Sequence, residues 1–255
     1  MIGIVARRPR SCAAVLAGAA SAALLAGCAA GGNGGTAASS TSASSSSASA
    51  SSSGSVSGSK LTKGLLPADA FGTQATVIGL TLEQLRQSTS TLGAGATAGL
   101  QVDPPSCAAA VQGTAPSFDK VDDLAAQSAV GTAGATVEAL MTGGPAKGAA
   151  EKLRGAAAAC PQATLTLPQA GQATIAFTTV QIKDMGDDAA ALQMTTSLTK
   201  PDGTKASVPA LIGAVEDHSR LLLLITAGTN GVAPDQAAFT ALLEKAYATQ
   251  HAALK

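Results

Sequence analysis

The chain has 255 residues, with 16 Lys and Arg against 16 Asp and Glu, 46% apolar residues and only 2% aromatic residues. A formal charge of zero, with no Lys/Arg run after residue 10 and few rings for bases to stack on, excludes an ordinary nucleic-acid-binding protein. No stretch reaches about 18 consecutive apolar residues, which excludes a multi-span membrane protein. The length allows one or two domains.

Residues 1–27 have the layout of a secretory signal peptide. Three arginines among the first ten residues precede an uncharged, Ala- and Leu-rich stretch from Ser11 to Gly27. The stretch ends in Leu25-Ala26-Gly27-Cys28, which resembles a bacterial lipobox at every position. The resemblance implies that the Cys28 thiol receives a diacylglyceryl group and that cleavage makes Cys28 the first residue of the mature chain. The alternative is a signal-anchor helix in which Cys28 is incidental.

The anchor determines where we expect the protein to be. Two acyl chains at one cysteine hold a protein stably, since each buried CH₂ contributes about 0.8 kcal/mol and a single chain binds marginally. Loss of residues 1–27 leaves 13 basic and 16 acidic residues, so charge alone would not attach the chain to anionic lipid. We therefore expect a lipid-anchored protein on the extracytoplasmic face of the cell membrane. Arg7-Arg8 also suggests twin-arginine export, but Pro9 and Arg10 depart from that pattern, and the export route stays open.

A tether follows the anchor. The 32 residues 28–59 carry no charge, and 14 of them are Ser, with mostly Ala, Gly and Thr between. Such a segment buries too little apolar surface to offset the entropy of ordering it, so we expect a disordered linker with a reach of about 30 Å.

Residues 60–255 are long enough for one core, without an internal repeat or boundary, and we expect a single domain. Acylation of Cys28 leaves two cysteines in the mature chain, Cys107 and Cys160. Outside the cytoplasm these should form a structural disulfide. A reactive thiol has no neighbouring CxxC motif or His to support it.

The first half of the domain mixes helices and strands. Thr81 precedes apolar residues at helical spacing and is a candidate N-cap, and Gly93–Gly99 has the composition of a loop. Residues 126–132 and 136–142 have the composition of strands joined at Gly134. Pro145 is expected to open an Ala-rich helix that ends at Cys160.

The second half alternates with period two. Strands are expected at residues 174–180, 191–199, 205–215 and 221–227, and Lys200–Thr204 has the Pro-Asp-Gly composition of a hairpin turn. Asp235–Lys255 should form a final helix that packs one apolar face on the sheet, formed by Phe239, Leu242, Leu243 and Ala246. The predicted class is α+β: an antiparallel sheet with helices packed on it and one disulfide.

The catalytic inventory is small, and we expect no cofactor and no metal. Neither His218 nor His251 has the spacing of a metal ligand or a nucleophile motif nearby. His251 falls near the end of the expected last helix, where a positively charged side chain is favourable. Glu216–Arg220 is the densest polar cluster and is expected to be a hairpin tip. Asp184, Asp187 and Asp188 lack the spacing of an EF-hand, which favours a solvated turn. Gly93–Gly99 departs from the dinucleotide-binding fingerprint by one residue.

Five features of the domain sequence carry a further resemblance. They are Leu65–Asp69, Pro104–Ala109, a helix ending at Cys160, apolar Arg220–Thr226 and a final helix. Together they resemble actinobacterial lipoproteins whose domain is similar to the extracellular sensor domain of mycobacterial transmembrane serine/threonine kinases. The resemblance implies a sheet and helices around a cleft that binds an envelope ligand. The chain departs from the kinase domain in having cysteines for one disulfide rather than two.

The leading hypothesis is a non-enzymatic lipoprotein whose domain binds an envelope lipid, glycan or protein ligand. One rival is an accessory interaction protein without a pocket, which would expose an apolar patch on the sheet or the last helix. The other is a hydrolase that uses carboxylates such as Asp217 or Asp187, which would need two acids converging in a pocket.

Overall fold

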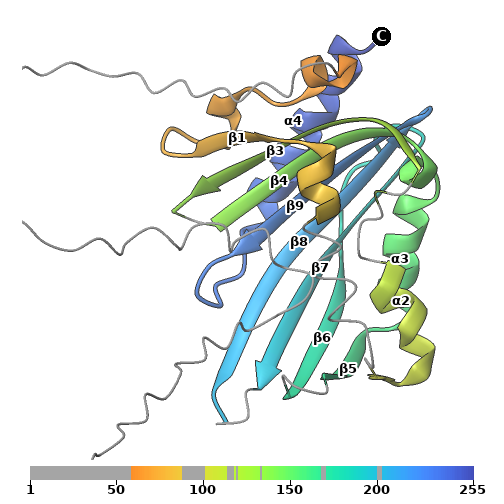
Figure 1. Cartoon of the computed structure of the whole chain (residues 1–255), viewed down its shortest axis with the longest axis vertical. Coiled ribbons are helices and arrows are strands. Elements are labelled where there is room, and N and C mark those ends of the chain that lie inside the picture. The colour runs from red at the N-terminus through yellow and green to blue at the C-terminus, as the bar shows by residue number, and fades with distance from the viewer. Residues whose placement is uncertain are drawn as a thin grey trace, which may run out of the picture.

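Antiparallel pairing joins nine strands into one sheet (Figure 1). The coordinates are a computed structural model, which describes residues 59–87, 101–113, 118, 120–132, 134–167, 171–199 and 203–255. The strand order is β1-β3-β4-β9-β8-β7-β6-β5-β2. The strands are β1 (Thr76–Leu80), β2 (Gln101–Asp103), β3 (Val121–Gly131), β4 (Gly134–Gly143), β5 (Gln162–Leu167), β6 (Gly171–Val180), β7 (Asp188–Thr199), β8 (Lys205–Asp217) and β9 (Arg220–Gly228).

The helices lie on both faces of this sheet. Helices α2 (Ala108–Gly113) and α3 (Ala149–Ala159) stand along one face beside β5, β6 and β7, and α4 (Gln236–Ala253) lies on the opposite face (Figure 1). Residues 82–87 are also helical. Short 3₁₀ helices occur at η2 (Lys60–Gly64), η3 (Ala68–Phe71), η4 (Pro105–Cys107) and η5 (Gly144–Ala146). The predicted α+β class with helices packed on an antiparallel sheet is confirmed.

Alternating side chains of the central strands build two separate cores. In β9, Leu221 and Leu223 face α2 and α3, whereas Leu222 and Leu224 face α4. Helix α4 approaches β8 closely at Gly213, where a Cβ atom would lie 2.8 Å from Leu243 Cδ2. The four residues predicted for the apolar face of α4 all belong to its core, with Leu242 partly buried.

Several boundaries differ from the sequence-based expectation. Pro145 lies in η5, and α3 begins four residues later at Ala149, because Gly148 adopts a left-handed conformation (φ 75°) that ends the preceding turn. Strand β3 begins at Val121 instead of 126. Thr81 does cap residues 82–87: its Oγ1 accepts from Gln84 N at 3.1 Å, and Gln84 Oε1 accepts from Thr81 N at 2.8 Å. The loop predicted at Gly93–Gly99 lies outside the described residues.

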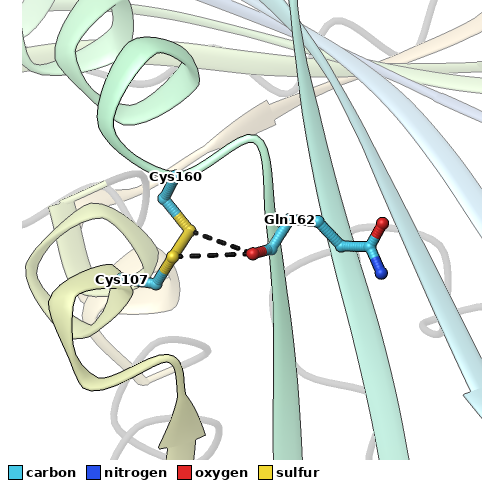
Figure 2. Close-up of a disulfide and its surroundings, with 3 residues drawn as sticks. All are labelled: Cys107, Cys160 and Gln162. Atoms are coloured by element: carbon cyan, nitrogen blue, oxygen red, sulfur yellow. Dashed lines mark hydrogen bonds between the residues drawn. A yellow bond between two sulfur atoms is a disulfide. The ribbon is translucent and has the colours of Figure 1, made fainter.

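The predicted disulfide between Cys107 and Cys160 is present. It joins the end of η4 to the residue that caps α3, with Cα atoms 5.2 Å apart (Figure 2). Both sulfurs lie against the Gln162 carbonyl oxygen, at 3.5 and 3.6 Å. Because a disulfide has no S–H, these are close contacts of oxygen with sulfur and not proton donation. The bond fixes α2 and α3 together at the start of β5.

None of the described helices is long and apolar enough to cross a membrane. Cys28, the residues before it and the tether to residue 58 lie outside the described residues. The domain boundaries at residues 27 and 59 therefore stay predictions.

The double variant Cys107→Ser/Cys160→Ser tests the contribution of the disulfide. At a sequence separation of 53 between the cysteines, it should lower the free energy of unfolding by about 4 kcal/mol, because the denatured chain regains loop entropy. Urea unfolding followed by circular dichroism measures this change. The reduced parent is the control and should unfold with the variant; equal stability of variant and oxidised parent would contradict the prediction.

Candidate functional site

A surface groove runs between the first half of α4 and the end of β6. The apolar part of its lining, which we call its floor, consists of the buried Val180 and the exposed Ala237 and Ala241. Its volume is about 620 Å³, which lies within the ~300–1,000 Å³ of ordinary small-ligand sites. The rest of the lining is polar and comes from Thr179, Gln181, Lys183, Gln236, Thr240 and Glu244. We call this site the α4 groove.

Polar contacts fix the walls of the α4 groove. Lys183 Nζ pairs with Glu244 Oε2 at 2.9 Å across it. Gln236 Nε2 donates to Gln193 Oε1 on β7 at 3.1 Å, which ties the first turn of α4 to the sheet. Asp235 starts the helix by accepting from Ala238 N. The groove thus presents hydroxyl and carboxamide groups and one ion pair over an apolar floor, a lining suited to binding a small polar ligand and lacking a nucleophile–base pair.

A second polar cluster forms where β8 turns into β9. The turn itself is only His218 and Ser219, and His218 has a positive φ of 60°. Asp187 Oδ2 accepts from His218 N at 2.6 Å and so holds this conformation. Asp217, at the end of β8, is buried, with its side chain 3% exposed. The expectation that Glu216–Arg220 forms a hairpin tip is confirmed, but Asp217 is buried there, because its neighbours supply enough donors for its carboxylate.

Three cationic or potentially cationic groups surround the Asp217 carboxylate. Arg220 Nη2 lies 2.7 Å from Oδ2, His218 Nδ1 lies 2.9 Å from Oδ1, and His251 Nδ1 lies 3.6 Å from Oδ2. Burial alone would raise the pKa of Asp217, but donation from Arg220 and His218 outweighs it, and the pKa lies below its usual range. Arg220 Nη1 also donates to Leu254 O at 2.5 Å, so the cluster fastens the end of α4 to the hairpin.

The same region contains a candidate metal-ligand set. One ligand atom each from Asp187, Asp217 and His218 lie within 4.8 Å of one another. Both Asp217 oxygens already accept from Arg220 and His218. The carboxylate is thus neutralised by the protein's own groups, and the cluster fits a structural clamp. His251 lies in the last turn of α4 as predicted, and it also faces Asp217.

The remaining acids of this region have structural partners. Glu216 accepts from Gly148 N and Ala150 N, both at 3.0 Å, and so caps α3 from a neighbouring strand. Asp188 forms a bidentate pair with Arg154, which lowers the pKa of Asp188. This pair is well exposed, so it contributes little to stability. Asp184 is exposed, as expected for a solvated turn.

A buried acid not anticipated from the sequence lies under the N-terminal segment. Glu138 on β4 has no exposed surface. Its carboxylate accepts from Leu66 N at 3.1 and 3.2 Å and from Gln127 Nε2 at 2.6 Å. Gln127 also donates to Leu66 O at 2.8 Å. Burial raises the pKa of Glu138 to about 7, although both hydrogen bonds oppose that shift.

Sequence reasoning missed both the α4 groove and Glu138. A signal existed for Glu138: on β4 it alternates with Leu140, and on β3 Gln127 alternates with Ala125, so both polar residues fall at core positions of apolar strands. The groove combines segments 53 residues apart or more, from Lys183 to Gln236 at the nearest, and no local pattern brings them together.

Comparison with known proteins finds neither a matching family model nor a matching curated protein. Among solved structures, the chain is similar to an uncharacterized protein from Mycobacterium smegmatis, at 15% identity and a TM-score of 0.48, covering 75% of this chain and 96% of that one. It is also similar to the extracellular domain of PknH from Mycobacterium tuberculosis, at 11% identity and a TM-score of 0.38, covering 72% and 92%. The resemblance expected from the sequence is met by structural similarity at this level, and the sensor function stays a prediction.

Substitution Glu138→Gln tests the buried acid. A pKa raised from 4.5 to about 7 means that folding favours the protonated form. Glu138 therefore contributes stability that is full below pH 4.5 and is lost as the pH rises through 7. The free energy of unfolding of the parent should fall over this range by up to about 3 kcal/mol relative to the variant, which cannot ionise.

Urea unfolding of both proteins at about pH 5 and about pH 8 measures that difference. Asp188→Asn is the matched control, because its exposed pair should shift stability little at either pH. Parallel pH profiles for parent and Glu138→Gln would contradict the prediction.

Proposed function

We propose that the chain is a non-catalytic, lipid-anchored lipoprotein of the cell envelope whose domain binds a ligand in the α4 groove. The observation that carries the proposal is the groove itself: a volume of about 620 Å³ with an apolar floor and a polar wall. The lipobox at Leu25–Cys28 supports the anchor, and the disulfide is consistent with an oxidising, extracytoplasmic location.

The placement of the acids supports a binding role over hydrolysis. Glu138 is sealed beneath Leu66, so no substrate reaches it in this conformation. Asp217 is held by Arg220 and His218 and has a lowered pKa, which makes it a poor general acid at neutral pH. The acid in the groove, Glu244, is paired with Lys183. No second acid lines the groove as the structure describes it.

A second candidate function rests on the opposite end of the sheet. Edge strand β1 carries no charge, and Ile78 and Val130 are 44% and 47% exposed on neighbouring strands there. An uncharged edge with exposed apolar side chains can accept an extended segment of another protein as an added strand. An accessory interaction protein is therefore the alternative, with β1 as its contact.

Substitution Cys28→Ala tests the anchor. Without the thiol no diacylglyceryl group can be attached, so the protein should remain unprocessed or appear in the culture medium. Fractionation of an actinobacterial host, with metabolic labelling by a clickable palmitate, measures both outcomes; Cys12→Ala is the matched control and should leave labelling unchanged. A normally cleaved Cys28→Ala protein that stays in the membrane fraction would overturn the anchor.

Substitution Ala241→Trp tests the groove, because an indole at its floor fills the volume without removing a polar group. Ala248→Trp is the matched control: it is an exposed alanine of α4, two turns further on, that does not line the groove. Native mass spectrometry of the detergent-extracted full-length protein should show a co-purified small molecule for the parent and the control. Its absence from the parent, or its retention by Ala241→Trp, would argue against the groove as a ligand site.

A further inference from the structure

Within the described residues, no helix covers one face of half of the sheet. On β5, β6 and β7 the side chains that face α2 and α3 are apolar and buried, among them Leu165, Ile175 and Leu192. The residues between them point to the face that carries α4, but α4 packs on β8 and β9. The uncovered positions, which we call the polar face, are Gln101, Asp103, Gln162, Thr164, Thr166, Gln172, Thr174, Ala176, Thr178, Gln193, Thr195, Ser197, Thr199, Lys205 and Ser207.

Strand register aligns these side chains in rows across five strands. One row contains Gln101, Thr166, Gln172, Thr199 and Lys205 in consecutive partner positions. The next row is formed in the same way by Asp103, Thr164, Thr174, Ser197 and Ser207. Neighbouring strands are about 4.8 Å apart, so each row presents hydroxyl or carboxamide groups at that interval, with one charged residue at its end, Lys205 or Asp103.

The polar face is nearly free of charge. Hydroxyl and carboxamide side chains make up all of it except Ala176 and the two charged residues Asp103 and Lys205, which lie on its outermost strands. Solvated surfaces commonly carry about 25–35% charged residues, which is more than this face has. The absence of basic clusters disfavours an anionic polymer, and the absence of large apolar side chains disfavours a lipid surface.

The hydrogen-bonding side chains of the polar face have few side-chain partners in the part of the chain that the structure describes. Within the described part of the chain, one side chain of the polar face forms a hydrogen bond with another side chain: Gln193 accepts from Gln236. That contact joins the polar face to the α4 groove, because Gln236 lines the groove. Val180, the next face position of β6 after Thr178, is part of the groove floor. Face and groove therefore form one continuous surface.

We propose that the polar face binds a neutral polysaccharide, with the chain lying along its rows and its end entering the α4 groove. Threonine and serine hydroxyls donate and accept, and glutamine offers both a donor and an acceptor, which matches the hydroxyl and acetamido groups of a neutral glycan. The inference rests on the proposed ligand-binding function and names its ligand class. Since the face has no aromatic ring for a sugar to stack on, each sugar contributes little and affinity must accumulate along the chain.

Oligosaccharides of increasing length test this proposal on the full-length protein in detergent. The probes are N-acetylglucosamine and glucose oligomers from disaccharide to octasaccharide, with dextran sulfate and phosphatidylglycerol vesicles as charged and lipid comparisons. Affinity for at least one neutral series should rise with each added sugar. No neutral binding at any length would overturn the proposal and leave an ordinary solvated sheet face, and a preference for dextran sulfate or for vesicles would also overturn it.

The double variant Thr174→Val/Thr195→Val removes two central hydroxyls while keeping side-chain shape and strand preference. It should weaken octasaccharide binding about tenfold, because two hydrogen bonds to the sugar chain are lost. Thr76→Val on β1, an exposed strand threonine at the other end of the sheet, is the matched control and should bind normally.

The groove variant separates this proposal from the proposed function. Loss of a co-purified ligand in Ala241→Trp, combined with unchanged octasaccharide binding by Thr174→Val/Thr195→Val, would retain the groove as a ligand site and refute the polar face. Loss of octasaccharide binding in the threonine variant with no small molecule ever found in the groove would retain the face and refute the groove.

Discussion

The two-sided apolar character of the central strands governs the rest of the structure. In β8 and β9 consecutive residues alternate between two cores, so both faces of these strands must be removed from water. Helices are therefore required on both sides. Nine strands at about 4.8 Å spacing span about 38 Å, whereas one helix covers only about 10 Å of width. Among the described elements, a single helix over β8 and β9 thus leaves the β2–β5–β6 side of its face open, and there the sequence becomes polar.

Local pattern predicted much of this fold. The period-two stretches gave β6 to β9, the spacing of Phe239 and Leu243 gave the buried side of α4, and the cysteine count gave the disulfide. The strand order could not be predicted, because β4 pairs with β9 about 85 residues later and no local signal specifies that contact. Short β2 was missed because three residues are too few for a period to show. The alternation of polar and apolar residues in β5 to β7 can likewise be read from the sequence. The alignment of the polar residues into rows cannot, because it depends on the register of the strands.

Two buried acids are accommodated in different ways. Asp217 accepts hydrogen bonds from Arg220 and His218, which outweigh its burial, so its pKa falls. The groups that donate hydrogen bonds to Glu138 are neutral, so the effect of burial dominates and its pKa rises. Sequence alone could not distinguish the two, since each is an acidic residue within a strand. Their difference comes from which distant residues the sheet places beside them, Leu66 in one case and His251 in the other.

The packing of the N-terminal segment has a mechanical consequence. Ser59 leads into η2, where a Cβ at Gly64 would collide with Leu254 at 2.7 Å and Leu140 at 2.9 Å, so the two ends of the domain are packed together. The hydrogen bonds of Leu66 to Glu138 and Gln127 follow two residues later. A pull applied to the chain before Ser59 would thus load η2 and these bonds before it reached β1. The end of α4 and the core of the sheet would bear this force, and the strands around the polar face would stay unloaded.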